Sequence, residues 1–504
     1  MRKTRYNPLP HVAVAVACTL AVAGGAGVPT ADPSIPGSAV IRVALDFTVS
    51  EASAELSAAM PAVSFELADV SLSDKRLYLL EYLPDDTETE SILDGLLNPK
   101  IEPFPPASLD WGELLYAGHD PEGHTGNIWF HSVGGIAEYQ AQYAATTLGL
   151  PPAQQRTGGS GVIVAVLDTG IDASHPLLAG SILPGGFNFI ADNSNTDDIG
   201  VGQSVGHGTF VAGLIHLVAP DADLLPIVVL NSDGIGDGWG LALALFYAID
   251  QGVDVINLSL GSTYDSAAVE FALEEAKDLG IVVVAAGGNQ NVGEGDFEEF
   301  PAVKHSKAFG VAALDDLDIK WSSSDPLEGS NFHPEFGISA PGASVLDAGG
   351  PDGFDPARTI YSSVPGGTYG IYEGGTSLAA AFVSGAAALV RAQHPNWPTT
   401  FMFGDDIVNE IEDVLQETSV EIYDPLNNPE NQAFLGQLGA GRLDVAAATL
   451  VGAGDIDADG TIGITDMLAL LAAWGPCVEA CRPDLDADGF VGITDFLTLF
   501  ANWG

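Results

Sequence analysis

The sequence predicts an α/β fold in which helices cover both faces of a parallel sheet. Two observations within residues 139–451 predict it. Apolar runs of strand length alternate with longer helical patterns, as in successive βαβ units. These elements are Trp239–Gln251, Val253–Leu258, Ala267–Leu279 and Ile281–Ala285. In addition, the run Val162–Leu167 is apolar at every position, which is typical of a strand buried on both faces.

The composition excludes two classes of partner. The 504 residues include 68 Asp or Glu and 16 Lys or Arg, which gives a formal charge of −52. Such a polyanion repels nucleic acid and anionic lipid. Hydrophobic residues make up 46% of the chain, so global disorder is excluded as well. The charge suits a Ca2+-rich or a salty environment, and the composition alone does not separate these two.

Residues 1–31 have the pattern of a secretory signal peptide. Arg2, Lys3 and Arg5 precede the apolar run Val12–Ala23, and small residues follow. Twelve residues are too few to span a bilayer comfortably, although a buried N-terminal helix remains the alternative. No later stretch is long and apolar enough to span. We therefore expect a secreted monomer, extracellular or associated with the cell surface, without a membrane span.

Residues 38–107 predict a small α+β unit ahead of the main block. Its strand-like runs are Ala39–Phe47 and Arg76–Leu83, and Thr87–Leu97 is helix-like with acidic residues in its first turn. A Pro-rich segment closes this unit. Residues 108–138 contain Gly and Pro in an irregular pattern, which suggests a linker.

Three motifs in the main block carry a candidate catalytic site. Asp168 ends the apolar strand Val164–Leu167, His207 begins a helical pattern, and Ser377 follows a Gly-rich turn before an Ala-rich helix. A neutral His can take the proton of a Ser hydroxyl during nucleophilic attack. A buried Asp holds that His in the required tautomer. Each motif alone also fits ordinary turn or cap chemistry, but their joint occurrence in this order is specific.

The block resembles the subtilisin-like (subtilase, peptidase S8) serine proteases over roughly residues 139–451. The resemblance implies hydrolysis of protein or peptide substrates through an acyl-enzyme, with Asp168 as orienting acid, His207 as general base and Ser377 as nucleophile. It also implies Asn289 as an oxyanion donor. The residues after Ser377 depart from the family pattern at Leu378, Ala381 and Phe382. These changes remove no catalytic group, and a catalytically dead surface or scaffold protein is the alternative.

The same resemblance implies a substrate-binding set and a propeptide. The substrate-binding residues are Ser259, Leu260, Gly261, Gly288 and Glu299. Glu299 takes the place of a usually small residue at the base of the S1 pocket, where a carboxylate would favour Lys or Arg. A solvated acidic pair on a variable loop is the alternative. Residues 38–107 resemble the inhibitory propeptide of a zymogen, which implies cleavage between Phe104 and Glu138.

Residues 455–504 contain an internal repeat with a period of 29. Each copy reads D-x-D-x-D-G-x-x-G-I-T-D, followed by an apolar helix that ends in Trp-Gly. Carboxylates at positions 1, 3, 5 and 12, with a backbone carbonyl at position 7, form the spacing of an EF-hand-type Ca2+ loop. The predicted ligands are Asp455, Asp457, Asp459, Thr461 and Asp466 in the first loop, and Asp484, Asp486, Asp488, Phe490 and Asp495 in the second. The sequence leaves open whether the main block holds further structural Ca2+ sites.

The paired loops, each followed by one helix, resemble a small all-α type I dockerin module. This resemblance implies a cohesin-like or cell-surface receptor as partner, although the repeat could instead be a sorting tail. Gly463 and Gly492 depart from the usual Asn at position 9, which suggests a water ligand. Cys477 and Cys481 lie between the repeats. In an exported chain they predict a local disulfide, with free thiols as the alternative.

Overall fold

The structure is a computed structural model, and its description covers most of the central block and parts of both ends. It describes residues 34–43, 48–60, 62–72, 75–83, 93, 97, 109–119, 134–294, 299–303, 307–323, 327–345, 355–394, 406–450, 454, 456, 462–476, 483, 485, 490–501 and 503. The predicted signal (1–31), most of the predicted helix Thr87–Leu97 and both late cysteines lie outside the described residues.

A seven-stranded sheet forms the centre of the molecule, in the order β12-β11-β10-β9-β5-β7-β6. Every recorded pairing in it is parallel, as the alternation of elements predicted. The strands are β5 (Ile163–Asp168), β6 (Phe187–Asn188), β7 (Asp223–Val228), β9 (Val255–Leu258), β10 (Val282–Ala286), β11 (Phe309–Leu314) and β12 (Ile338–Pro341).

Helices cover both faces of this sheet. Alternate residues of β5 enter different cores: Val164 and Val166 pack with α6 (His207–Val218) and α9 (Thr376–Gln393). Ala165 and Leu167 pack with α7 (Gly238–Gln251) and α8 (Ala267–Asp278). This division follows from the two-residue side-chain period of a strand. It explains why the strand is apolar at every position.

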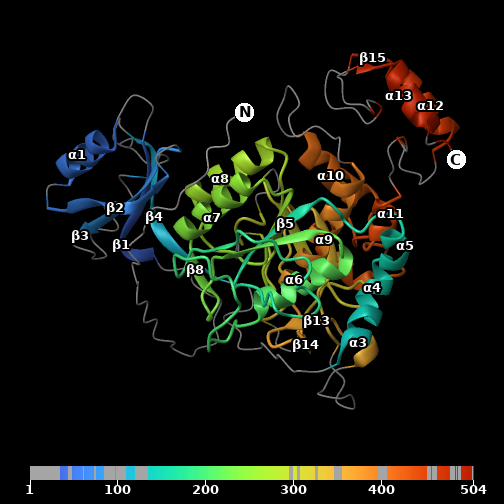
Figure 1. Cartoon of the computed structure of the whole chain (residues 1–504), viewed down its shortest axis with the longest axis horizontal. Coiled ribbons are helices and arrows are strands. Elements are labelled where there is room, and N and C mark those ends of the chain that lie inside the picture. The colour runs from blue at the N-terminus through green and yellow to red at the C-terminus, as the bar shows by residue number, and fades with distance from the viewer. Residues whose placement is uncertain are drawn as a thin grey trace.

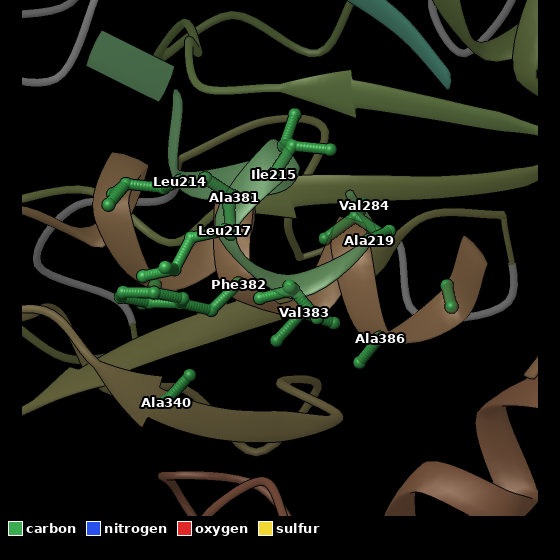
Figure 2. Close-up of a cluster of buried hydrophobic side chains, with 14 of the residues drawn as sticks. Leu214, Ile215, Leu217, Ala219, Val284, Ala340, Ala381, Phe382, Val383 and Ala386 are labelled. Carbon is green, nitrogen blue, oxygen red and sulfur yellow. The ribbon is translucent and has the colours of Figure 1, made fainter. Parts of the chain in front are cut away.

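The core beneath α6 and α9 places the two helices that carry candidate catalytic residues. Figure 2 shows Leu214 and Ile215 of α6 gathered with Ala381, Phe382 and Val383 of α9. All five side chains are fully buried. Small residues let the helices approach closely: a Cβ on Gly385 would lie 2.6 Å from the Val218 side chain. The N-terminus of each helix is therefore held in a fixed place relative to the sheet.

The chain order makes β5 the switch point of the sheet. After β5 the chain passes through α6 to β7 on one side, and then through α7 to β9 on the other side. In open α/β sheets, ligands bind outside the carboxyl ends of strands at such a point. Asp168 is the last residue of β5. The topology alone therefore places Asp168 where α/β proteins bind their ligands.

The remaining elements of the central block surround this framework. The hairpin of β13 (Tyr361–Val364) and β14 (Thr368–Ile371) lies against α6. The peripheral helices are α3 (Ile136–Ala141), α4 (Tyr143–Thr147), α5 (Leu150–Gln154), α10 (Asp406–Glu417), α11 (Val445–Ala448) and the short 3-10 helices η2 (Pro356–Arg358) and η3 (Pro429–Phe434).

The N-terminal unit is an antiparallel sheet with a helix, in agreement with the predicted α+β pattern. Its elements are β1 (Ser34–Val43), α1 (Val49–Ala59), β2 (Ser64–Leu72), β3 (Leu77–Leu83) and β4 (Leu109–His119). The prediction of an irregular linker over 108–138 is wrong for 109–119, which form β4. Gly and Pro around this strand hide its pattern, and its hydrogen bonds come from β1, which is distant in sequence.

This N-terminal unit contacts the central block over α7 and α8 (Figure 1). Val40 and Leu77 join the core cluster that contains both helices. The Arg42 guanidinium lies 4.1 Å from the centre of the Phe271 ring, and Lys75 forms an ion pair with Glu275. Strand β4 also pairs antiparallel with β8 (Ile235–Asp237), so one five-stranded sheet joins the two units.

The C-terminal repeat forms two helices, α12 (Ile464–Ala472) and α13 (Ile493–Ala501), as predicted. A short antiparallel pair, β15 (Gly475–Pro476) with β16 (Phe490–Val491), connects the two copies, so the module is not purely helical. Within the described residues, no helix has the length and apolar character required to cross a membrane.

Candidate active site

Asp168 and His207 form a buried pair at the carboxyl edge of the sheet. The Nδ1 nitrogen of His207 lies 2.8 and 3.0 Å from the two carboxylate oxygens of Asp168, and both side chains are fully buried. An ionised carboxylate only accepts hydrogen bonds, so Nδ1 carries the proton. In this tautomer Nε2 is the basic nitrogen of the ring. The His207 ring also meets Tyr372 edge-on, with centroids 6.1 Å apart.

Glycines flanking His207 allow this close approach. Gly206 precedes α6 with φ of +97°, a left-handed conformation that favours glycine. A Cβ on Gly208 would lie 2.2 Å from the carbonyl oxygen of Gly170 and 3.0 Å from Oδ1 of Asp168. Any larger residue at position 208 would therefore separate the helix from the strand end. This close contact explains why the second residue of the motif His-Gly-Thr is glycine in this fold.

Ser377 is the second residue of α9 and is fully buried. Its Oγ donates to the carbonyl oxygen of Ser259 at 3.4 Å, and the Ser259 hydroxyl donates to the carbonyl oxygen of Ser377 at 3.0 Å. Ser259 directly follows β9, and the register Leu167↔Leu258 makes it the neighbour of Asp168 across the sheet. The structure therefore brings Ser377, Ser259 and the Asp168–His207 pair to one edge of the sheet.

Asn289 is anchored to the start of α9. Its Oδ1 accepts from the backbone N–H of Thr376 at 2.8 Å and from the Thr376 hydroxyl at 3.0 Å. The same hydroxyl accepts from the backbone N–H of Gly288 at 2.9 Å. Because an N–H donor requires the oxygen end of the amide, these bonds fix which way the Asn289 amide is oriented. Asn289 and Ser377 are thus held as neighbours through Thr376.

A second segment holds the loop that carries Asn289. The Asn331 amide donates to the carbonyl oxygen of Gly287 at 3.1 Å, and its Oδ1 accepts from the backbone N–H groups of Gln290 and Val292, each at 3.1 Å. The buried Lys320 ammonium donates to the carbonyl oxygen of Ser330 at 3.0 Å and to the Asn291 side chain. Burial lowers the pKa of Lys320 to about 8.

Glu299 lies between the two segments that were expected to bind substrate. It is 1% exposed. A Cβ on Gly261 would meet the Glu299 carboxylate at 2.2 Å, and a Cβ on Gly288 would meet it at 2.9 Å. The alternative of a solvated pair on a variable loop does not hold for Glu299, because this residue is buried. Ser259, Leu260, Gly261, Gly288 and Glu299 therefore belong to one neighbourhood.

The predicted calcium ligands are only partly within the described residues. Asp466 and Asp495 are buried. Oδ1 of Asp466 accepts from the backbone N–H of Ile456 at 2.6 Å, and Oδ2 accepts from that of Gly463 at 2.7 Å. Asp495 makes the matching bonds 29 residues later, at 2.6 Å each. Phe490 lies in β16 and is partly exposed.

The other predicted ligands lie outside the described residues, as do Cys477 and Cys481. They are Asp455, Asp457, Asp459, Thr461, Asp484, Asp486 and Asp488. Among the described residues, no group of three or more His, Cys, Asp or Glu side chains has the arrangement of a metal site. The donor chemistry at position 12 of each loop nevertheless suits a closed Ca2+ loop, because this carboxylate folds back onto the loop backbone in both copies.

Sequence reasoning missed several residues that build this site. Thr376 was seen only as the neighbour of Ser377, although it anchors Asn289. Asn331 and Lys320 lie some forty and thirty residues beyond the segment they hold, and no local pattern marks them. Asp198, a buried carboxylate near His207, is one of many acids in an Asn- and Asp-rich loop. Only their burial and tertiary contacts distinguish these residues from polar residues of the same types elsewhere in the chain.

The fold and the site together define a class: a parallel α/β protein with an Asp–His pair and a helix-terminal Ser at the carboxyl edge of its sheet. The sequence profile of the subtilase family matches residues 159–441, more than half of the chain. The protein belongs to the subtilase family.

Individual relatives agree with this assignment. Subtilisin NAT of Bacillus subtilis subsp. natto is 37% identical over 249 residues, which cover 47% of this chain and 58% of that protein. Subtilisin Savinase of Lederbergia lenta is 37% identical over 257 residues, which cover 49% of this chain and 82% of that protein. The chain therefore spans little more than half the length of the first of these relatives.

The fold likeness extends to a solved structure. A crystal structure described as a lanthipeptide protease matches with a TM-score of 0.51 and 24% identity, covering 64% of this chain and 98% of that one. At this identity the likeness concerns the fold alone.

Proposed function

We propose that this protein is a secreted serine endopeptidase that cleaves peptide bonds through Asp168, His207 and Ser377. The observation that carries the proposal is the buried hydrogen bond between Asp168 and His207 at the switch point of the sheet, one strand away from the contact between Ser377 and Ser259. Membership of the subtilase family supports the same chemistry. The substrates are proteins or peptides.

The mechanism follows from the chemistry of these groups. Ser377 Oγ attacks the scissile carbonyl carbon while Nε2 of His207 takes its proton. Asp168 stabilises the imidazolium that forms, without accepting the proton itself. His207 then returns the proton to the leaving amine, and water hydrolyses the acyl-enzyme by the reverse sequence. The developing oxyanion is stabilised by the backbone N–H of Ser377 at the start of α9 and by the Asn289 amide.

Peptide hydrolysis by the purified protein tests this function. We expect cleavage of an unfolded protein substrate that a serine-reactive phosphonate abolishes and that a thiol-blocking reagent leaves intact. A purified, folded protein that cleaves no peptide bond in a broad peptide library would support the alternative, a catalytically inactive scaffold with a subtilase fold.

Replacing Asn289 tests the oxyanion role separately. Asn289→Ala removes one donor to the transition state but leaves Asp168, His207 and Ser377 in place. We expect kcat to fall about 10²- to 10³-fold with KM nearly unchanged, a magnitude known from the corresponding change in a subtilisin and not calculated for this chain. Steady-state kinetics with a peptide substrate measures both constants. A proportional rise in KM with kcat preserved would instead assign Asn289 to substrate binding.

Glu299 supports a more specific proposal, a preference for basic residues at P1. Its carboxylate is buried between Gly261 and Gly288, where a Cβ on either glycine would meet it. A carboxylate in a partly desolvated pocket attracts a cationic side chain and repels an anionic one. The substrate side chain bound there would therefore be Lys or Arg.

One substitution tests this preference. Glu299→Gly should reduce cleavage after Lys and Arg relative to wild type and increase cleavage after large apolar residues. Raising the salt concentration should narrow the difference between the two enzymes. A library of peptides varied at P1 measures the profiles, and Glu294→Gly is the control for a nearby loop carboxylate. Identical P1 profiles dominated by large apolar residues would exclude Glu299 from the pocket.

The N-terminal unit is proposed as an inhibitory propeptide. Its strand β4 adds to the edge strand β8 with the register Ala117↔Asp237, Gly118↔Gly236 and His119↔Ile235. Pairing along an exposed strand is also how an extended peptide substrate binds a sheet edge. The contacts of Arg42 with Phe271 and of Lys75 with Glu275 hold the unit on α8. Self-cleavage between Phe104 and Glu138 would then produce the mature enzyme.

The C-terminal repeat is proposed as a Ca2+-dependent docking module that takes a cohesin-like or cell-surface receptor. Each helix exposes an apolar stripe at equivalent positions: Ile464, Leu468 and Leu471 on α12, and Ile493, Leu497 and Phe500 on α13, with exposed fractions between 45% and 66%. Such a face is unusual on a free surface and favours a partner. Loop carboxylates at the predicted spacing would hold Ca2+ and order the two helices.

A further inference from the structure

A second buried carboxylate lies at the start of the helix that carries His207. Asp198 is 3% exposed and belongs to the loop that precedes α6. Its Oδ1 accepts from the backbone N–H of Gly206 at 2.8 Å. Its Oδ2 accepts from the backbone N–H of Thr209 at 3.1 Å and from the Thr209 hydroxyl at 2.7 Å. Gly206 is the N-cap residue of α6 and has no side chain that could cap the helix. Asp198 therefore accepts from the backbone N–H groups at this end of the helix in its place.

The same carboxylate is tied to the strand that carries Asp168. The Thr169 hydroxyl donates to Oδ1 of Asp198 at 3.3 Å and accepts from the backbone N–H of Gly208 at 3.1 Å. Thr169 directly follows Asp168, and Gly208 directly follows His207. Asp198 thus connects the two segments whose separation sets the distance between the Asp168 carboxylate and the His207 ring.

We propose that Asp198 is a positioning residue for catalysis, which holds His207 against Asp168 and contributes negative charge that stabilises the His207 imidazolium. The inference rests on the proposed peptidase function of the same site. It assigns to Asp198 both a geometric effect, through its four hydrogen bonds, and an electrostatic effect, through its charge.

The titration of Asp198 agrees with this geometry. Burial raises the pKa of Asp198 to about 6, the hydrogen bonds from Gly206 and Thr209 oppose that rise, and the charge of Asp168 adds to it. The folded protein binds this proton more tightly than the unfolded chain does. The contribution of Asp198 to the free energy of unfolding therefore falls as the pH rises from about 4 to about 6. Above about pH 6 the carboxylate is ionised and acts on His207.

Other titratable groups lie around this cluster. Asp168 is the titratable group whose charge acts on Asp198, and His207 directly follows Gly206, which donates to Asp198. Asp172 contacts Thr209 through its backbone: the Asp172 N–H donates to the Thr209 hydroxyl at 3.0 Å. Asp197 is adjacent in sequence but exposed.

Asp198→Asn tests the proposal, because it keeps the shape and removes the charge and one acceptor. We expect kcat to fall about 10- to 100-fold with KM changed less than about twofold, since a small misplacement of a catalytic group lowers the rate steeply. The acid limb of the kcat/KM profile should also move about half a pH unit lower, because the imidazolium loses a stabilising charge. Asp197→Asn removes the same charge from the neighbouring exposed position, and it should change neither kcat nor the position of the acid limb.

A second variant separates the geometric effect from the charge. Thr209→Val removes the hydroxyl that donates to Asp198 and accepts from the Asp172 backbone N–H, but it keeps the Asp198 carboxylate. We therefore expect kcat to fall while the acid limb of the kcat/KM profile stays in place. If Asp198→Asn does not fold, a fall in kcat for Thr209→Val with KM preserved still supports the proposal. Unchanged kcat and an unchanged acid limb in a folded Asp198→Asn enzyme would overturn it. A wild-type protein without peptidase activity would instead refute the proposed function.

Discussion

Ser377→Ala is expected to abolish peptide hydrolysis and to leave the protein unprocessed between Phe104 and Glu138. Without Ser377 Oγ there is no nucleophile for the acyl-enzyme, although Asp168 and His207 remain paired. The expected loss in kcat is about 10⁶-fold, which is the magnitude known for removal of the nucleophile in a subtilisin and not a value calculated for this chain. Mass spectrometry of the expressed protein and a peptide assay measure the two effects.

The control must show that the loss is chemical and not a folding defect. Ser419→Ala removes a serine hydroxyl that bonds Gln416 at the end of α10, away from the carboxyl edge of the sheet, and should process normally. The Ser377→Ala protein should also be cut when active wild type is added, since its cleavage site is intact. Normal maturation of Ser377→Ala expressed alone would show that another peptidase performs the cleavage.

Removal of Ca2+ is expected to unfold the C-terminal module, whose loops carry the predicted ligands. The eight predicted loop carboxylates repel one another without a cation, so Ca2+ binding free energy becomes folding free energy for α12 and α13. In full-length Ser377→Ala, which cannot digest itself, a chelator should lower the helical circular dichroism and make residues after 454 sensitive to an added protease. Asp459→Ala combined with Asp488→Ala should reproduce the effect of the chelator.

A matched double variant tests whether this response is specific. Asp192→Asn combined with Asp197→Asn removes two carboxylates from a loop of the central block and should leave the C-terminal helices Ca2+-dependent and folded. A helical signal and protease resistance that are the same with and without Ca2+ would contradict the assignment of the repeat as a calcium module.

The central sheet could be predicted because its pattern is local. The predicted strand Val162–Leu167 and helix Ala267–Leu279 agree with β5 and α8 within one residue. The N-terminal unit was harder, since α1 and β2 were not anticipated and β4 was expected to be irregular. Strand β4 is stabilised by β1 and β8, which lie far away in sequence, and no window around Leu109–His119 contains that information.

The site was predictable as a set of motifs and not as a set of contacts. The order of Asp168, His207 and Ser377 identified the residues, and the buried Asp168–His207 bond agrees with that order. The supporting bonds of Thr376, Asn331 and Asp198 depend on loops of irregular length. Their side chains are of types common in any turn, so only the folded arrangement distinguishes them. Burial of Glu299 between two glycines likewise depends on tertiary structure.

Labelling of the wild-type protein with a serine-reactive phosphonate, followed by peptide mass spectrometry, tests the central claim most directly. The proposed mechanism predicts about one label per active molecule, attached to Ser377, because only that serine has an activated hydroxyl. Labelling should be lost in His207→Ala, which keeps Ser377 but removes its base. Absence of label from a folded, mature protein, or labelling of a different serine with Ser377 unmodified, would contradict the assignment of Asp168, His207 and Ser377 as a catalytic triad.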